Sequence, residues 1–448
     1  MKKTRHGNKK ELGSDPFGSE PPDMIELNAV LDVEKLGARG EGVSRGPHGL
    51  VFTPYALPGE KIRAEVDGER GKLIEVLTPS PDRVAPLCPH FTHCGGCAVQ
   101  TLAAPAYRAW KGGLVAEALR NAALAAQVAP LVAAWGVGRR RAAFHSRNDQ
   151  RGEPHVGFMQ ARSHRIFELE SCPILAPEMA GALSAAGRVA EILKSLDKPL
   201  DLVVTASLGG LDLDLRGCGQ LDFALEQALI EAATELDLAR VSNHGLPLVE
   251  RRAPQIVVGR ARVTPPPGAF LQATAAGEEA LARLVLDAMG GAKRTADLFC
   301  GVGTFALRLA EKAEVFCAES DAGALAACLR GARETQGLRL VNGERRDLFD
   351  RPLRAAELAS FDAVVFDPPR AGAEAQAREL AKSDIPTLAG VSCNPKTFAR
   401  DAKILIEGGY RLERVTPVDQ FLFSPHVELV GVFRKAPQRP ARKRRLLG

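Results

Sequence analysis

Three short motifs in the last third of the chain carry a thiol and two carboxylates. Asp367 follows an apolar run and precedes two prolines, Cys393 lies in Ser-Cys-Asn-Pro, and Glu428 precedes another apolar run. A thiolate is a strong nucleophile, and a nearby glutamate can act as a general base. A buried cysteine usually only packs, and a glutamate at a strand edge is usually only solvated. Because Asp367 and Cys393 each follow an apolar strand pattern, and parallel strands end at one sheet edge, we expect an active site there, with Glu428 as a base if it lies near the thiol.

A glycine-containing loop, residues 300–304 (Cys-Gly-Val-Gly-Thr), follows a strand pattern that contains Asp297. Glycine lets the backbone approach a ligand closely, and the next helix offers free N–H groups at its start. Glu319 ends the following strand pattern, where a carboxylate can accept both hydroxyls of a ribose. Two glycines alone are a weak signal and fit an ordinary tight turn better than a ligand site. The third glycine of a dinucleotide motif is missing, which favours S-adenosylmethionine over a nicotinamide cofactor.

Cysteines near residue 90 indicate a metal site. Three clustered cysteines and one remote cysteine can supply four thiolates: Cys88, Cys94, Cys97 and Cys172. Such a set fits zinc or an iron–sulfur cluster. His90 or His93 could join a zinc site, and Cys-Gly-Gly-Cys could also be redox-active. We interpret four other cysteines as packing residues: Cys218, Cys300, Cys317 and Cys328.

The elements that must position these residues divide the chain into five expected parts. Short strands with turn clusters predict a small barrel, mixed patterns predict a central α+β domain with a helix near 106–126, and alternating strands and helices predict a doubly wound α/β domain. The expected parts are a basic and polar leader (1–23), the barrel (24–80), the central domain with the cysteine cluster (81–264), the doubly wound domain (265–434) and a basic tail (435–448).

Composition excludes several classes of protein. The chain has 448 residues, of which 45% are apolar and 25% charged, which is typical of globular proteins with several domains. Nine cysteines are an odd number, and no apolar stretch follows the basic start, so we expect a cytoplasmic protein without a disulfide framework. Residues 122–135 form the most apolar stretch, which is shorter than the ~20 residues that cross a bilayer.

The net charge of +5 conceals an uneven distribution. Residues 1–10 hold five Lys or Arg and residues 434–448 hold seven, with no acid in either segment, so the rest of the chain carries −7. Two basic arms on an acidic body suit contact with phosphates of a nucleic acid. A tail that only keeps the protein soluble fits the charge equally well.

Taken together, the motifs resemble the RNA (uracil-5-)methyltransferase family, in particular its branch with an iron–sulfur cluster and a TRAM domain that acts on bacterial 23S rRNA. The resemblance covers residues 24–434. The elements Gly-x-Gly-Glu-Gly-Val and Ala-Leu-Pro-Gly-Glu resemble TRAM, an OB-like barrel, and the family implies a class I (Rossmann-like) catalytic domain. It also implies an RNA partner, 23S rRNA first, while a monomer remains the default.

The resemblance implies a role for each site residue. Cys393 is the nucleophile and Glu428 the base. A 4Fe–4S cluster is held by Cys88, Cys94, Cys97 and Cys172. The pocket for S-adenosylmethionine or the target base is lined by Gln272, Phe299, Thr304, Glu319, Asp347 and Asp367. The chain departs from the family at Phe299, where tyrosine is frequent, and at Thr274 and Thr304, where asparagine is frequent.

The implied reaction is addition of Cys393 to C6 of an extruded uracil, methyl transfer to C5 and removal of the C5 proton by Glu428. Three alternatives stay open. A uracil-5-methyltransferase of this type could act on tRNA. The Asp-Pro-Pro loop also resembles amino-methyltransferases of adenine or cytosine, which need neither Cys393 nor Glu428. The chain could instead be an RNA-binding scaffold with a degenerate methyltransferase fold.

Overall fold

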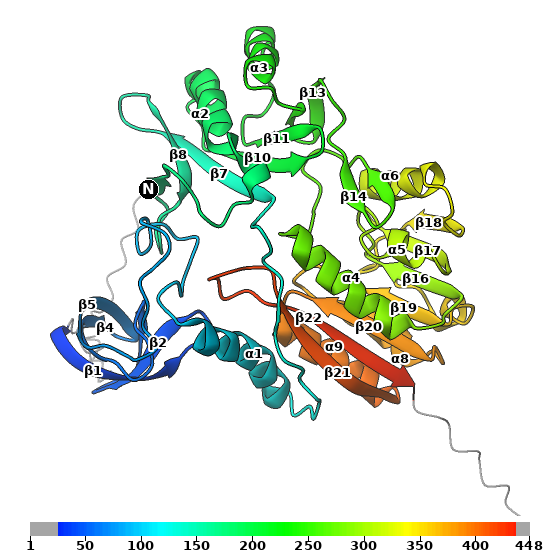
Figure 1. Cartoon of the computed structure of the whole chain (residues 1–448), viewed down its shortest axis with the longest axis horizontal. Helices are drawn as coiled ribbons and strands as arrows, with labels where there is room; N and C mark the ends of the chain where they lie inside the picture. The colour runs from blue at the N-terminus through cyan, green and yellow to red at the C-terminus, as the bar shows by residue number, and fades with distance from the viewer. Residues whose placement is uncertain (1–25, 436–448) are drawn as a thin grey trace, which may run out of the picture. The chain divides into compact units, whose positions relative to one another are not determined.

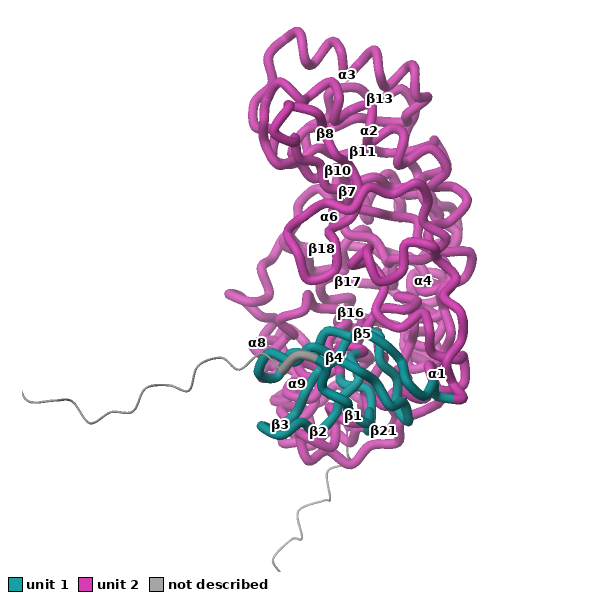
Figure 2. Tube along the Cα trace, turned by 90° about the vertical axis from the view of Figure 1, so that its left-hand side faces the viewer, with its two compact units in different colours: residues 1–37, 41–80 teal, residues 38–40, 81–448 magenta. Residues whose placement is uncertain are grey.

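The computed structural model describes residues 26–435 (Figure 1). The expected leader, and the expected tail beyond Lys435, lie outside the described residues. Contacts divide the chain into two compact units, residues 1–37 with 41–80 and residues 38–40 with 81–448 (Figure 2). No helix within residues 26–435 is long and apolar enough to cross a membrane.

Five strands of the first unit close into a barrel in the order β1-β2-β3-β5-β4, which confirms the expected N-terminal barrel. They are β1 (Glu26–Leu36), β2 (Glu41–Gly46), β3 (Gly49–Pro54), β4 (Lys61–Asp67) and β5 (Arg70–Thr78). Alternate residues point inward, as the two-residue period of a strand requires. In β4, for example, Ile62, Ala64 and Val66 are buried in the barrel core.

A seven-stranded sheet forms the first part of the second unit, in the order β13-β12-β11-β10-β7-β8-β9. Its strands are β7 (Arg141–Asn148), β8 (Pro154–Met159), β9 (Ile166–Glu168), β10 (Leu200–Ser207), β11 (Gly210–Arg216), β12 (Arg240–Asn243) and β13 (Leu246–Glu250). Helices α2 (Ala182–Leu193) and α3 (Phe223–Glu235) pack against it, and 3-10 turns occupy Pro177–Met179 and Lys194–Leu196.

An eight-stranded sheet forms the last part of the chain, in the order β18-β17-β16-β19-β20-β22-β21-β6. Its strands are β6 (Val132–Ala133), β16 (Arg294–Leu298), β17 (Glu314–Glu319), β18 (Val341–Arg345), β19 (Ala363–Phe366), β20 (Thr387–Ser392), β21 (Tyr410–Asp419) and β22 (Glu428–Lys435). The first five strands in this order are parallel, and β22 lies antiparallel between β20 and β21.

Helices cover both faces of this sheet, which confirms the doubly wound α/β fold. The helices are α4 (Ala275–Met289), α5 (Ala306–Leu309), α6 (Ala322–Glu334), α7 (Ala355–Leu358), α8 (Glu374–Ala381) and α9 (Pro395–Glu407). One core contains α4, α5 and α6, and the other contains α7, α8 and α9. The hairpin of β14 (Ile256–Val258) and β15 (Ala261–Val263) packs into the first core, although it precedes residue 265.

Helix α1 (Ala104–Asn121) packs with α9 and β21, so the segment before the central sheet belongs to the second core. The sequence predicts this helix over 106–126, but it ends five residues earlier. Ala123 adopts a left-handed conformation (φ 56°), and the N–H of Leu124 donates to the carbonyl of Leu119 (2.9 Å). These features form a Schellman cap, which stops the helix even though the sequence supplies alanine where glycine is usual.

Candidate active site

The expected site residues gather where parallel strands end. Asp367 directly follows β19 and Cys393 directly follows β20. In the antiparallel pairing of β20 with β22, Ser392 lies opposite Leu429, so Cys393, which follows Ser392, lies beside Glu428 at the start of β22. The carboxyl edge of an open α/β sheet is where such folds bind ligands. The structure therefore brings the thiol and both carboxyl groups to one edge.

The glycine loop is shaped by backbone that few side chains tolerate. Phe299, Gly301 and Gly303 have φ values of 64°, 54° and 97°. A Cβ atom on Gly303 would lie 2.6 Å from Sγ of Cys328, so only glycine fits there. Asp297 is fully buried below the loop, and one of its carboxylate oxygens accepts from the N–H of Ala306 (2.8 Å). The loop is thus held in a fixed shape at the start of α5.

Glu319 is fixed by three hydrogen bonds at the end of β17. Its Oε2 accepts from the N–H of Gly301 (2.9 Å), and its Oε1 accepts from the hydroxyl of Ser320 (3.1 Å) and the N–H of Asp321 (2.9 Å). The carboxylate therefore connects the glycine loop to the start of α6. This position agrees with that of a ribose-binding acid in doubly wound folds.

The other predicted donor residues lie around the same loop. The ring of Phe299 packs against Phe349, with centroids 5.6 Å apart. Asp347 is exposed after β18 and accepts from the N–H of Phe349 (2.9 Å). Thr304 is partly buried in the loop. Thr274 instead caps α4, because its hydroxyl accepts from the N–H of Gly277 (2.8 Å) and donates to a backbone carbonyl.

Two buried glutamines connect the two carboxyl groups of the site. The amide of Gln272 donates to Oδ2 of Asp367 (3.3 Å). The amide of Gln420 donates to Oε1 of Gln272 (2.6 Å) and to Oε1 of Glu428 (3.2 Å). Gln272, Gln420 and Glu428 are each no more than 3% exposed. Sequence reasoning missed Gln420, and its only local signal was a polar pair, Asp-Gln, at the end of an apolar strand.

Burial shifts the ionisation of both carboxyl groups. It raises the pKa of Asp367 to about 7. It also raises the pKa of Glu428 to about 8, with a further increase from the charge of Asp367. The hydrogen bond from Gln420 and the positive charges of Arg370 and Lys111 oppose this increase. Both groups can therefore exchange protons near neutral pH, which is the range that acid–base catalysis requires.

Cys393 occupies the turn between β20 and α9. Asn394 caps α9, because its side chain accepts from the N–H of Lys396 (3.1 Å), and its amide also donates to the carbonyl of Arg370 (3.2 Å). The thiol is partly exposed. Burial and the charges of Glu428 and Asp367 raise the pKa of Cys393 to about 11, and Arg370 opposes them. The resting thiol is protonated and must lose its proton before it can act as a nucleophile.

Helix α1 anchors the loop that leads to Glu428. Lys111 and Asp419 form a fully buried ion pair (Nζ to Oδ1, 2.8 Å), and the hydroxyl of Tyr107 donates to Oδ2 of Asp419 (2.7 Å). Lys111 also donates to the carbonyls of Phe421 (3.2 Å) and His426. These bonds hold both ends of the segment between β21 and β22. Nothing in the alanine-rich sequence around Lys111 predicted this role.

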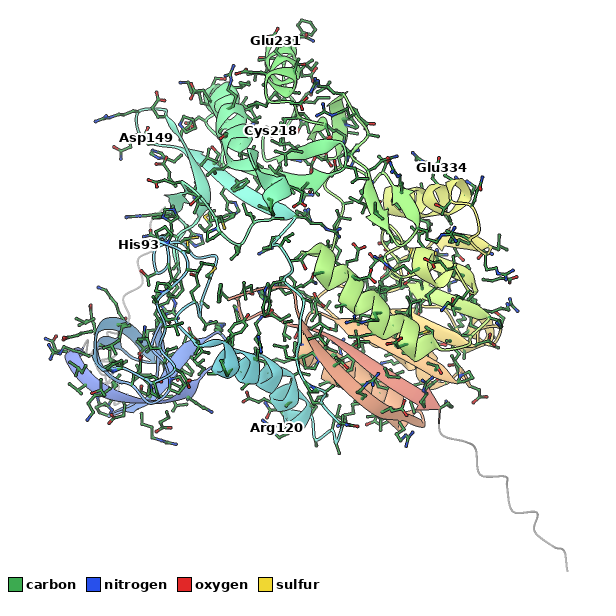
Figure 3. The ribbon with its side chains drawn as sticks, viewed as in Figure 1. His93, Arg120, Asp149, Cys218, Glu231 and Glu334 are labelled. Carbon is green, nitrogen blue, oxygen red and sulfur yellow. The ribbon has the colours of Figure 1, made fainter. Side chains whose placement is uncertain are left out.

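The four predicted cluster cysteines line one cavity, together with His90 and Gln100. The loop that bears three of them is fixed to the central sheet, because the N–H of Gly95 donates to the carbonyl of Met159 (2.9 Å) (Figure 3, in which His93 marks this loop). The N–H of Gly96 donates to Sγ of Cys94 (3.4 Å). A backbone N–H that donates to a cysteine sulfur stabilises its thiolate form. This arrangement is suited to a cysteine that binds a metal ion or an iron–sulfur cluster.

The same loop approaches the segment before Glu428. The N–H groups of Ala98 and Val99 donate to the carbonyl of Phe423 (2.8 and 3.2 Å). The N–H of Phe423 donates in turn to the hydroxyl of Tyr107 (3.0 Å). The cysteine loop and α1 therefore both support the segment before Glu428.

Within the arginine run 139–141, the side chains of Arg140 and Arg141 make contacts inside the protein. Arg140 donates to the carbonyl of Gln272 (3.1 Å) and pairs with Glu278. Arg141 donates to the carbonyl of Gly268 (3.2 Å). The run thereby fixes the backbone that carries Gln272.

Comparisons with known proteins agree with this geometry. Residues 260–436 match a family model described as tRNA (Uracil-5-)-methyltransferase. An uncharacterized RNA methyltransferase of Brucella suis is 48% identical over 408 residues, which cover 91% of this chain and 98% of that protein. The 23S rRNA (uracil(1939)-C(5))-methyltransferase RlmD of Chromohalobacter salexigens is 33% identical over 427 residues, which cover 89% and 87%.

A solved structure shows the same fold. It is the Pyrococcus abyssi tRNA (uracil-54, C5)-methyltransferase in complex with S-adenosyl-L-homocysteine, with a TM-score of 0.68, 21% identity and coverage of 92% of this chain and 100% of that chain. The chain is thus at least 33% identical to RNA methyltransferases of two bacteria, and each match covers most of this chain and most of the relative. The chain belongs to the RNA (uracil-5-)methyltransferase family.

Proposed function

We propose that the protein transfers the methyl group of S-adenosylmethionine to C5 of a uridine in 23S rRNA. The observation that carries this proposal is the contiguity of Cys393 with Glu428 and Asp367, two buried carboxyl groups with raised pKa values. The 33% identity with a 23S rRNA enzyme favours this RNA over others.

The first step is nucleophilic addition. The sulfur of Cys393 bonds to C6 of the uracil, and the electrons of the C5–C6 double bond move toward O4 to form an enolate. Because the pKa of Cys393 is about 11, only about one thiol in ten thousand is ionised at pH 7. The ionised carboxylate of Asp367 therefore accepts the thiol proton as addition occurs, because Glu428 must remain unprotonated for the last step.

Asp367 then orients the ring and supports its charge. With a pKa of about 7, its carboxyl group is protonated in a large fraction of molecules and can donate to the enolate oxygen. The amide of Gln272 holds one of its oxygens (3.3 Å) and so restricts its orientation. In the next step C5 attacks the methyl carbon, the methyl–sulfonium bond breaks and S-adenosylhomocysteine is released.

Glu428 completes the reaction as a base. Its carboxylate removes the C5 proton, the C5–C6 double bond re-forms and the bond from C6 to Cys393 breaks. Gln420 fixes the orientation of this carboxylate through Oε1 (3.2 Å), which leaves its second oxygen for the proton. Because the pKa of Glu428 is about 8, the elimination step accelerates as pH rises toward 8.

The methyl donor occupies the edge formed by the glycine loop. Glu319 binds the ribose hydroxyls, and the other proposed contacts are Gln272, Phe299, Thr304, Asp347 and Asp367. The hydrogen bond from Gly301 to Glu319 (2.9 Å) supports this assignment, because it sets the carboxylate beside the loop backbone. S-adenosylmethionine supplies an electrophilic methyl group when bound.

A 4Fe–4S cluster held by Cys88, Cys94, Cys97 and Cys172 is the second proposed cofactor. Their shared cavity supports a single four-thiolate site. His90 also lines this cavity and its Nε2 has no partner among residues 26–435, so zinc with mixed ligands is the competing occupant. Anaerobically purified protein should be brown and contain iron and sulfide; stoichiometric zinc without iron would exclude the cluster.

The barrel is proposed to be a TRAM domain that binds RNA.

Methylation of 23S rRNA transcripts with labelled S-adenosylmethionine tests the function. Wild-type protein and Cys218→Ala should form 5-methyluridine, and Cys393→Ala should form none. Glu428→Gln should accumulate a protein–RNA adduct that survives denaturing electrophoresis. Methylated tRNA but not 23S rRNA would favour the tRNA alternative. Methylated adenine or cytosine would exclude the uracil chemistry altogether.

A further inference from the structure

Three buried cysteines outside the proposed reaction lie together below the glycine loop. The Sγ atoms of Cys300, Cys317 and Cys328 all lie within 4.8 Å of one another, and each residue is at most 3% exposed. Cys300 belongs to the glycine loop, Cys317 to β17 and Cys328 to α6. Three elements therefore converge on one group of thiols, which the sequence indicated only as separate packing residues.

The thiols contact one another directly. The thiols of Cys300 and Cys317 are hydrogen-bonded to the thiol of Cys328. A soft cation stabilises thiolates and displaces their protons. With metal–sulfur bonds of about 2.3 Å, tetrahedral geometry places the sulfurs about 3.8 Å apart. Sulfurs that already lie within 4.8 Å need little movement to reach that spacing.

A buried carboxylate supplies an independent observation. Asp297 is paired with Cys317 in the register of β16 and β17, so both side chains lie on the same face of the sheet. Asp297 is 0% exposed, and its Oδ1 has no hydrogen-bond partner among the described residues. An unpaired buried carboxylate oxygen is costly, and three packed thiols alone do not explain it.

We propose that Cys300, Cys317 and Cys328 bind one thiophilic d¹⁰ cation of the zinc or cadmium class, with Asp297 as an oxygen donor. Thiolates select such soft cations over magnesium or calcium. The site is separate from the four cysteines near residue 90, because its ligands come from β16, β17, α6 and the glycine loop.

Ion binding would also set the shape of the glycine loop. Cys300 lies in that loop, and Gly303 is tight against Cys328. An ion that joins these elements restricts the loop that we propose to hold S-adenosylmethionine, so this consequence rests on the proposed function. We expect bound cadmium to change the affinity for S-adenosylhomocysteine at least threefold. If S-adenosylhomocysteine does not bind at all, the proposed function fails, but the ion count below still tests the site.

Native mass spectrometry of the full chain with Cd²⁺ under reducing conditions tests the site. Wild type and the control Cys218→Ala should carry one more Cd²⁺ than Cys317→Ala and Cys300→Ala. Cys218 is a suitable control because it is a buried cysteine of the central sheet region (Figure 3). Equal counts in all four proteins would overturn the proposal. Because Cys300 lies in a loop, Cys300→Ala keeps the test valid if Cys317→Ala does not fold. In both variants the ultraviolet absorption from sulfur-to-cadmium charge transfer should fall together with the Cd²⁺ count.

Discussion

Replacing Glu428 by glutamine should stabilise the protein above pH 5, although it removes the proposed base. Burial raises the pKa of Glu428 to about 8 from its ordinary 4.5. Below pH 4.5 the carboxyl group is protonated in both the folded and the unfolded chain, so it contributes no pH dependence. Between pH 4.5 and 8 it ionises in the unfolded chain only, so wild-type stability falls as pH rises. Glutamine does not ionise, so the variant does not lose stability in this way as pH rises.

The magnitude follows from the size of the shift. A shift of about 3.5 units corresponds to about 5 kcal/mol above pH 8 and about 3 kcal/mol at pH 7. The second unit holds about 370 residues, for which about 3 kcal/mol corresponds to roughly 4 °C in Tm. Glutamine keeps the shape of the side chain and an oxygen that accepts from Gln420.

Thermal unfolding of wild type and Glu428→Gln from pH 5 to pH 8.5 tests this prediction. The Tm difference should be small at pH 5 and should grow to several degrees at pH 8. Glu407→Gln is the matched control, because Glu407 is an exposed glutamate on α9 and the variant makes the same change of charge away from the site. A difference between Glu428→Gln and wild type that is independent of pH, or that favours wild type at pH 8, would refute the reasoning.

Three further predictions concern other contacts. Lys111→Met should destabilise the fold by about 3 kcal/mol or more in urea unfolding, because it leaves Asp419 buried without its cation, and adding Asp419→Leu should restore most of the loss. No recovery in the double variant would contradict this account. Ala123→Gly should raise the free energy of unfolding by about 1 kcal/mol, because glycine adopts the φ of 56° without strain; a loss of stability would show that another contact controls this cap. Gly303→Ala should weaken binding of S-adenosylhomocysteine at least tenfold in calorimetry, because its methyl group would overlap Cys328, and unchanged affinity would exclude a donor site at this loop.

Local sequence patterns were sufficient for the architecture and for half of the site. Alternating strands and helices predict a doubly wound sheet, and an acid or a thiol directly after an apolar run marks the carboxyl edge. Asp367 and Cys393 follow this rule because parallel strands all end at the same edge of the sheet. Short strands separated by turn clusters likewise predict the barrel, because turns at regular short spacing join neighbouring strands of one small sheet.

Local sequence patterns could not predict contacts between segments that lie far apart in the sequence. Glu428 reaches Cys393 because β22 lies antiparallel between β20 and β21, an arrangement that no local period encodes. Gln272 and Gln420 are 148 residues apart, and Lys111 and Asp419 are 308 apart. A polar residue on an alanine-rich helix has the same local pattern whether it faces water or a buried carboxylate.

The cysteines also divide into those that the sequence could assign to one site and those that only the tertiary structure brings together. Four of them were assigned to a shared site from their clustering and from the family resemblance, and they line one cavity. Cys300, Cys317 and Cys328 come from a loop, a strand and a helix, and they meet only when β17 and α6 pack beside the glycine loop. The sequence alone predicted which residues could react and placed Asp367 and Cys393 at one sheet edge. The tertiary structure decided which of them touch, because burial and pairing across the sheet set each pKa and each hydrogen bond.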